Sequence, residues 1–184
     1  MRWGALEVSG ANSWYDNTGL TFGAKYGTCS IVISNGGKLT CYTPCLSSSG
    51  STVDVAVVGT GSVFESGIAN LIPYTTDGSV ARLSIRNGGR MKSTGTTTSF
   101  YVRENGSVFL EDGRIEGAPG WHSNEKYRHY WNQSLTRGTG CIQTGSLEND
   151  GGRLEPGAPI GCLEVDGVLN LHDSGTLAVE IGGR

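Results

Sequence analysis

The densest group of side chains that could bind a ligand lies between residues 117 and 140, a stretch flanked by glycines on both sides. Its aromatic and polar members are Trp121, His122, Tyr127, Arg128, His129, Tyr130 and Trp131. Aromatic rings present flat apolar faces with polar edges. This composition predicts a surface that binds a glycan ring or a protein partner. An alternative is that the rings pack on the protein beneath them or on a second subunit.

The same stretch has features of a short helix. Ser123 or Asn124 could cap its amino end. Tyr127, Tyr130, Trp131 and Leu135 then fall at helical spacing on one side. We therefore expect residues 117–140 to form an inserted loop or short helix that stands off the rest of the fold.

Charged residues gather once, at Glu111, Asp112, Arg114 and Glu116. Enzymes that cleave polysaccharides need paired carboxylates at a set separation. In a strand Glu111 and Asp112 would face opposite sides, so a solvated face is the favoured interpretation. A carbohydrate-active enzyme with Asp112, Arg114 and Glu116 near a groove remains an alternative.

A second polar run, His172-Asp173-Ser174, contains the residue types of a catalytic triad. Triad members are brought together by the fold from separate places in the chain, so three adjacent residues favour a polar turn. The sequence predicts no catalytic residue, and it leaves enzymatic activity uncertain.

Five cysteines occur, with Cys41 and Cys45 four residues apart. Zinc sites prefer two such pairs or nearby histidines, and no histidine lies near these two in the sequence. Small buried side chains are the favoured interpretation. A metal or redox pair and a disulfide are the alternatives. No cofactor and no bound metal are expected.

Composition limits the classes of partner. The 184 residues carry a net charge of −3, and a basic stripe of the kind that binds nucleic acid is missing from the sequence. No apolar run approaches the ~18 residues that a membrane-spanning helix needs. We therefore expect neither a nucleic-acid partner nor a membrane span.

Short strands and tight turns are indicated along most of the chain. Alternating apolar residues mark strands at Val53, Val55 and Val57 and again at Leu83 and Ile85. The 30 glycines lie between such runs. The phrase Asn-Gly-Gly followed by a basic and an apolar residue occurs at residues 35–39 and again at 87–91, 52 residues later (87 − 35). A looser copy lies at residues 149–154.

The repeat distinguishes two all-β architectures. Strands with glycine turns fit either a β-sandwich or a β-solenoid. A solenoid favours repetition because each coil contacts only its neighbours. A unit of about fifty residues holds several strands, so it is expected to be two coils. The sequence predicts one right-handed parallel β-helix over residues 1–184, with an insertion at 117–140 and a β-sandwich as the alternative.

A family resemblance supports this fold. The run Val-x-Gly-x-Gly-Ser-x-Phe at 57–64 and the run Leu-Ser-Ile-Arg-Asn-Gly-Gly at 83–89 resemble the glycine-rich repeats of autotransporter (type V secretion) passengers and related bacterial surface proteins. Residues 161–171 and 175–183 are similar to passenger segments too. The resemblance implies a right-handed parallel β-helix and export from the cell.

These observations lead to a functional expectation. We expect a non-enzymatic structural or adhesive module of a bacterial surface or secreted protein, which binds a glycan or partner through the aromatic stretch. A self-associating assembly that resembles a phage tail spike is a further alternative, with contacts through the solenoid ends or residues 121–131. The location is expected to be secreted or at the cell surface if the chain belongs to a longer exported protein, and cytoplasmic if it is complete.

Overall fold

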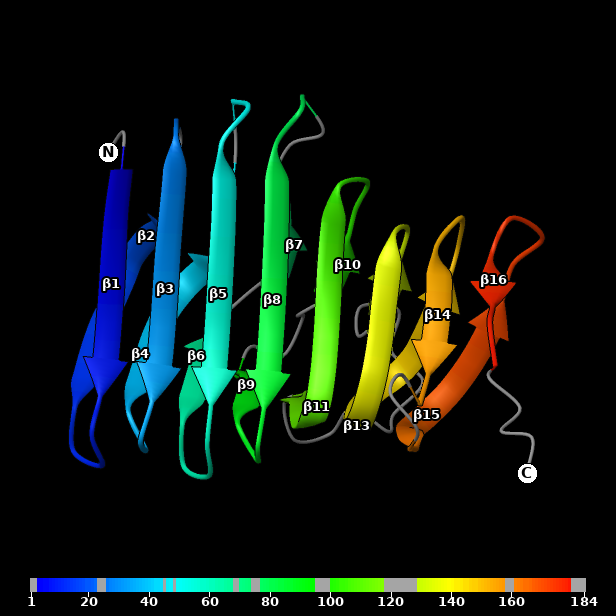
Figure 1. Ribbon diagram of the computed structural model, residues 1–184. Coiled ribbons are helices and arrows are strands. Elements are labelled where there is room, and N and C mark those ends of the chain that lie inside the picture. Colours follow the sequence, from blue (N-terminus) through cyan, green and yellow to red (C-terminus); the bar gives the residue numbers. More distant parts are fainter. Residues whose placement is uncertain are drawn as a thin grey trace.

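The computed structural model is a parallel β-solenoid (Figure 1). The described residues are 3–22, 26–44, 46–47, 49–67, 70–73, 77–94, 100–117, 129–157 and 161–179. Every strand pairing among them is parallel. These parallel pairings connect the strands β1 to β16. Parallel pairing confirms the predicted solenoid and excludes the β-sandwich, whose sheets are antiparallel.

The strands line three faces. Face A is β1 (Trp3–Ser9), β3 (Thr28–Ser34), β5 (Thr52–Val58), β8 (Val80–Arg86), the first half of β11 (Gly106–Glu116), the start of β13 (Leu135–Asn149), β14 (Arg153–Pro156) and β16 (Thr176–Leu177). It faces the reader in Figure 1. Face B is β2 (Trp14–Phe22), β4 (Lys38–Pro44), β6 (Val63–Ser66), β9 (Arg90–Ser93), the end of β11, the middle of β13 and the start of β15 (Leu163–Leu171). Face C is β7 (Asn70–Ile72), β10 (Phe100–Val102), β12 (His129–Asn132) and the ends of β13 and β15.

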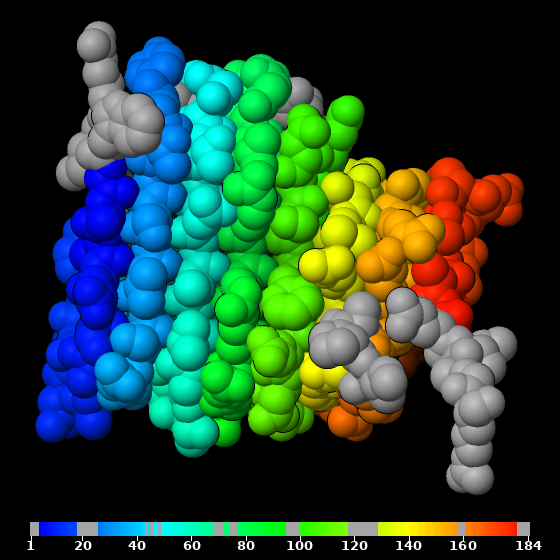
Figure 2. Space-filling model, viewed as in Figure 1, coloured from blue at the N-terminus to red at the C-terminus, as the bar shows by residue number. Residues whose placement is uncertain are grey.

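Alternating side chains fill the interior of the coils. Strand β5 buries Val53, Val55 and Val57, and these residues pair in register with Ala81, Leu83 and Ile85 of β8. Because equivalent positions stack coil on coil, aliphatic side chains form continuous columns along the axis. Figure 2 shows the coils as side-by-side bands.

The register explains the length of the sequence repeat. Thr28 pairs with Thr52, and Thr52 pairs with Val80, so two coils take 52 residues (80 − 28). The two Asn-Gly-Gly phrases therefore lie two coils apart at the same corner, between faces A and B. The looser copy at residues 149–152 lies at a different corner, where face C leads into face A.

Corner glycines allow neighbouring coils to approach closely. A Cβ at Gly37 would lie 2.3 Å from the carbonyl oxygen of Val8, and one at Gly89 would lie 2.4 Å from that of Val57. No side chain fits at such a separation. Glycine is required at these positions by the backbone of the preceding coil.

The expected helical excursion is wrong for the part that the structure describes. Residues 129–132 form β12, and residues 135–140 begin β13. Tyr130 points inward and Trp131 outward, so the two do not share a face as helical spacing would require. Residues 118–128, including Ser123 and Asn124, lie outside the described residues.

Candidate functional site

Three successive coils bring polar side chains together on face C. Strand β12 pairs in register with the end of β13, and the end of β13 pairs with the end of β15. Trp131, Glu148 and Asn170 therefore occupy one row across the face. We call the cluster of His129, Trp131, Ser146, Glu148, Asn170 and His172 the Trp131 site.

Inward neighbours hold these strands in place. Tyr130 is 1% exposed and stacks on Phe100 of β10, with ring centroids 4.9 Å apart. Asn132 donates to Asn149 Oδ1 (2.7 Å) and accepts from the Thr136 hydroxyl (2.9 Å). These buried contacts fix β12 against β13, so the outward side chains between them have a defined position.

Glu148 lies at the centre of the site and is 7% exposed. Its Oε1 accepts hydrogen bonds from Ser146 Oγ (2.5 Å) and Asn170 Nδ2 (2.9 Å). Its Oε2 lies 2.9 Å from His172 Nε2, and His129 Nδ1 lies 3.7 Å from Oε1. Burial alone would raise the pKa of this carboxyl, but the hydrogen bonds from Ser146, His172 and Asn170 and the charge of His129 lower it overall. The Glu148 carboxylate is therefore ionised, and both of its oxygens accept hydrogen bonds from neighbouring side chains.

Trp131 is half-buried between two imidazoles. The ring of His172 stacks on it with centroids 6.3 Å apart, and the ring of His129 meets it edge-on at 5.9 Å. His129 Nδ1 also bonds Ser146 Oγ. The result is an aromatic surface with an amide and two imidazoles at its border, which is a chemistry suited to binding polar rings.

A pH prediction follows from the lowered pKa of Glu148. A carboxyl whose pKa is lower in the folded state stabilises the fold above its unfolded pKa of about 4.3, and this stabilisation is lost as pH falls through the folded pKa. We expect the wild-type protein to lose more unfolding free energy between about pH 5 and pH 3 than the Glu148→Gln variant. Urea unfolding at each pH measures this, and parallel pH profiles for the two proteins would contradict it.

The structure divides the predicted binding residues into three groups. His129 and Trp131 lie at the surface of the Trp131 site. Tyr130 lies inside the coil and is almost completely buried. Trp121, His122, Tyr127 and Arg128 lie outside the described residues.

Four members of the site were not predicted: Ser146, Glu148, Asn170 and His172. For His172 the sequence indicates only a polar turn. A signal existed in the alignment of His129-Tyr130-Trp131-Asn132 with Ser146-Leu147-Glu148-Asn149, which share asparagine at the last position. That alignment places Glu148 beside Trp131.

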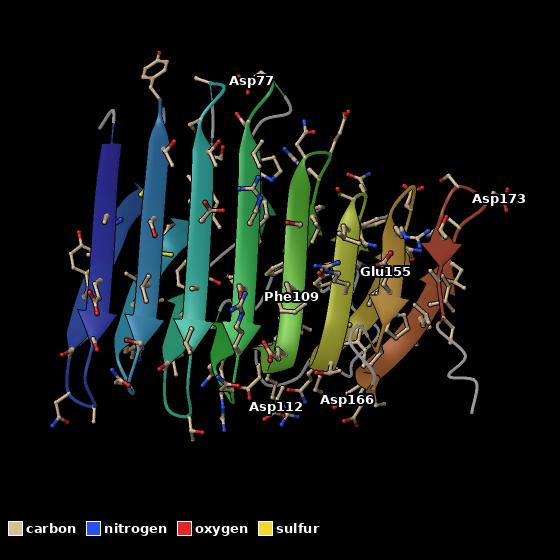
Figure 3. All side chains as sticks on the ribbon, in the orientation of Figure 1. Asp77, Phe109, Asp112, Glu155, Asp166 and Asp173 are labelled. Carbon is tan, nitrogen blue, oxygen red and sulfur yellow. The ribbon has the colours of Figure 1, made fainter. Side chains whose placement is uncertain are left out.

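A separate groove of about 470 Å³ lies at the corner between faces A and B. Its polar lining includes Arg90, Asp112, Arg114, Thr139, Cys141, Cys162 and Glu164. Strand β11 carries an irregularity between Leu110 and Gly113, where Asp112 has a φ of 53°. Figure 3 shows Asp112 at the lower end of β11. Irregularities of this kind turn side chains away from the sheet face.

The acidic cluster of the sequence is only partly in this groove. Asp112 and Arg114 line it. The Glu116 carboxylate instead pairs with Arg90 (3.5 Å) and Arg114 (3.4 Å). Asp112 and Arg114 therefore line the groove directly, whereas the Glu116 carboxylate is held in ion pairs with two arginines that line it.

The cysteines have different environments. Cys41 is buried, which agrees with the favoured interpretation for that residue, and Cys45 lies outside the described residues. Cys141 and the exposed Cys162 line the groove as free thiols. Burial raises the pKa of the Cys141 thiol, and nearby Arg114 lowers it in part.

The part of the chain that the structure describes contains neither a metal-binding cluster nor a membrane-spanning helix. Within these ranges no group of three or more histidine, cysteine or acidic side chains is arranged to hold a metal ion. No helix in the described ranges is long and apolar enough to cross a membrane.

The fold defines the class: the chain is a parallel β-solenoid repeat protein. No protein-family model, curated protein or solved structure matches it. Functional inference therefore depends on the chemistry of its surfaces.

Proposed function

We propose that this chain is a non-enzymatic structural or adhesive module of a bacterial surface or secreted protein, and that it binds a glycan at the Trp131 site. The stacked coils supply a rigid rod, and face C presents the contact surface. The resemblance to autotransporter passengers supports the surface location.

The observation that carries the proposal is the half-buried Trp131 between His129 and His172, next to an ionised carboxylate. An aromatic face can stack on a sugar ring, and Asn170 and the imidazoles can bond its hydroxyls. Glu148 already accepts three hydrogen bonds. A carboxylate in that state positions its neighbours and is poorly suited to take a proton from a substrate.

The test is binding of the purified chain to a glycan array, followed by titration of the best glycan. We expect Trp131→Ala to weaken binding at least about fivefold, because stacking contributes on the order of 1 kcal/mol or more. Phe109→Ala is the matched control, since Phe109 is a partly exposed aromatic on face A. Absence of any bound glycan, or equal binding by both variants, would refute the proposal.

A carbohydrate-active enzyme is a second candidate, because Asp112 and Arg114 line the groove. Polysaccharide cleavage that is lost in Asp112→Asn but kept in Trp131→Ala would favour the enzyme over the adhesive module.

A further inference from the structure

Strands β2 and β4 of face B carry three exposed aromatic side chains, Trp14, Tyr15 and Tyr42, all remote in sequence from the Trp131 site. Tyr15 pairs with the buried Leu39 and points to the opposite side of the sheet from Trp14. Trp14 of β2 is 64% exposed and Tyr42 of β4 is 46% exposed. Rings of this size normally bury most of their surface. Neither side chain contributes to the apolar interior of the solenoid.

A hydrogen bond fixes the orientation of the Trp14 ring. Trp14 pairs in register with Lys38, and Asp16 pairs with Thr40. The Trp14 Nε1–H nevertheless donates to Thr40 Oγ1 (3.0 Å), so the indole reaches diagonally from β2 across to β4. A side chain already held in one orientation loses little entropy when a ligand stacks on it.

Tyr42 continues the aromatic surface towards the next coil. It lies two residues beyond Thr40 on β4, and side chains two apart share one face of a strand. A Cβ at Gly67 would lie 3.1 Å from Tyr42 Cδ2, so the ring extends over a position that has no side chain. The Gly67 amide also donates to the Tyr42 carbonyl (3.1 Å). Trp14 and Tyr42 thus cover a diagonal strip that starts at β2 and ends beside β6.

A polar border accompanies the strip. Lys38 Nζ lies 2.8 Å from Glu65 Oε2. Lys38 is the neighbour of Trp14 across the sheet, and Glu65 is the neighbour of Thr40. The ammonium can donate to a hydroxyl, and the carboxylate can accept from one. Aromatic faces beside a paired donor and acceptor match the two surfaces of a pyranose, which are its C–H face and its hydroxyl edge.

We infer that Trp14 and Tyr42 form a stacking platform for pyranose rings, with Lys38 and Glu65 bonding the hydroxyl edge. The inference rests on the proposed glycan-binding function and adds a second contact on a different face. Pyranoses whose substituents are all equatorial present flat C–H faces, so β-1,4-linked glucose is the expected ligand class. With sites on faces B and C, one module can hold a glycan surface by two contacts.

The test is titration of the full chain with cellohexaose, followed in two-dimensional NMR through the Trp14 Nε1–H resonance. We expect that resonance to shift. Binding should weaken at least about tenfold in Trp14→Ala, and a few-fold in Thr40→Val, which removes only the acceptor that orients the ring. Tyr26→Ala is the control, because Tyr26 is 55% exposed and lies outside the platform; its affinity should not change.

The outcomes separate this inference from the proposed function. Cellohexaose binding that is lost in Trp131→Ala and kept in Trp14→Ala would overturn the platform and leave the Trp131 site standing. Loss in Trp14→Ala with full binding by Trp131→Ala would support the platform and show that cellohexaose does not bind at the Trp131 site, which the glycan array tests separately. A wild-type chain that does not bind cellohexaose at all would overturn the platform.

Discussion

Replacement of Asn132 by alanine is expected to lower the free energy of unfolding by about 3 kcal/mol. The Asn132 side chain is 0% exposed, and its Nδ2 donates to Asn149 Oδ1 and to the Arg153 carbonyl. Its Oδ1 accepts from Thr136. Truncation leaves buried polar atoms on two adjacent coils without their partner, and each such atom costs about 1–3 kcal/mol.

Urea unfolding of the variant measures this loss. Asn12→Ala is the control, since Asn12 lies exposed in a turn and should change stability by no more than about 0.5 kcal/mol. Equal stability of the two variants would mean that the interior asparagine contacts between coils do not exist as described.

Gly89→Ala is expected to destabilise the fold by about 3 kcal/mol, because the added methyl would meet the Val57 carbonyl of the preceding coil at 2.4 Å. The coils would have to separate locally to admit it. A comparable loss is expected for Gly37→Ala, which meets the Val8 carbonyl in the same manner.

Gly50→Ala separates this clash from backbone strain. Gly50 has a φ of 71°, but the nearest atom to an added Cβ, the Asp77 carbonyl oxygen, is 4.0 Å away. We expect a loss of only about 1 kcal/mol there, from the left-handed backbone alone. If Gly89→Ala cost no more than Gly50→Ala, the close approach of successive coils at the A–B corner would be contradicted.

Much of the fold could be predicted from the sequence, because local residue patterns specify the strands and the coils. Alternation of Val53, Val55 and Val57 specifies a strand and its inward face. The 52-residue spacing of the Asn-Gly-Gly phrases specifies two coils. Both patterns are short-range or periodic, so they can be recognised in the sequence without knowledge of the strand pairing.

The Trp131 site could not be predicted in the same way. Trp131, Glu148 and Asn170 come together only through the pairing of β12, β13 and β15. Coil length varies: Ser107 pairs with Leu135 after 28 residues (135 − 107), whereas Leu135 pairs with Arg153 after 18 (153 − 135). A fixed repeat length would therefore misplace Glu148 relative to Trp131. An outward carboxylate on a strand also looks like any solvated residue.

The error over residues 129–140 has a related cause. Tyr130, Trp131 and Leu135 fit helical spacing when considered alone. The pairing of Tyr130 with Phe100 and Leu147 in neighbouring coils selects the strand instead, because stacking between coils outweighs local periodicity.

Interstrand NOEs among β12, β13 and β15 test most directly the parallel register on which the Trp131 site depends. Parallel pairing in register predicts backbone amide and Hα contacts that link Trp131 with Glu148 and Glu148 with Asn170. Short Hα–Hα contacts between these strands, which arise between antiparallel neighbours, or contacts that place Trp131 opposite another residue of β13, would contradict it.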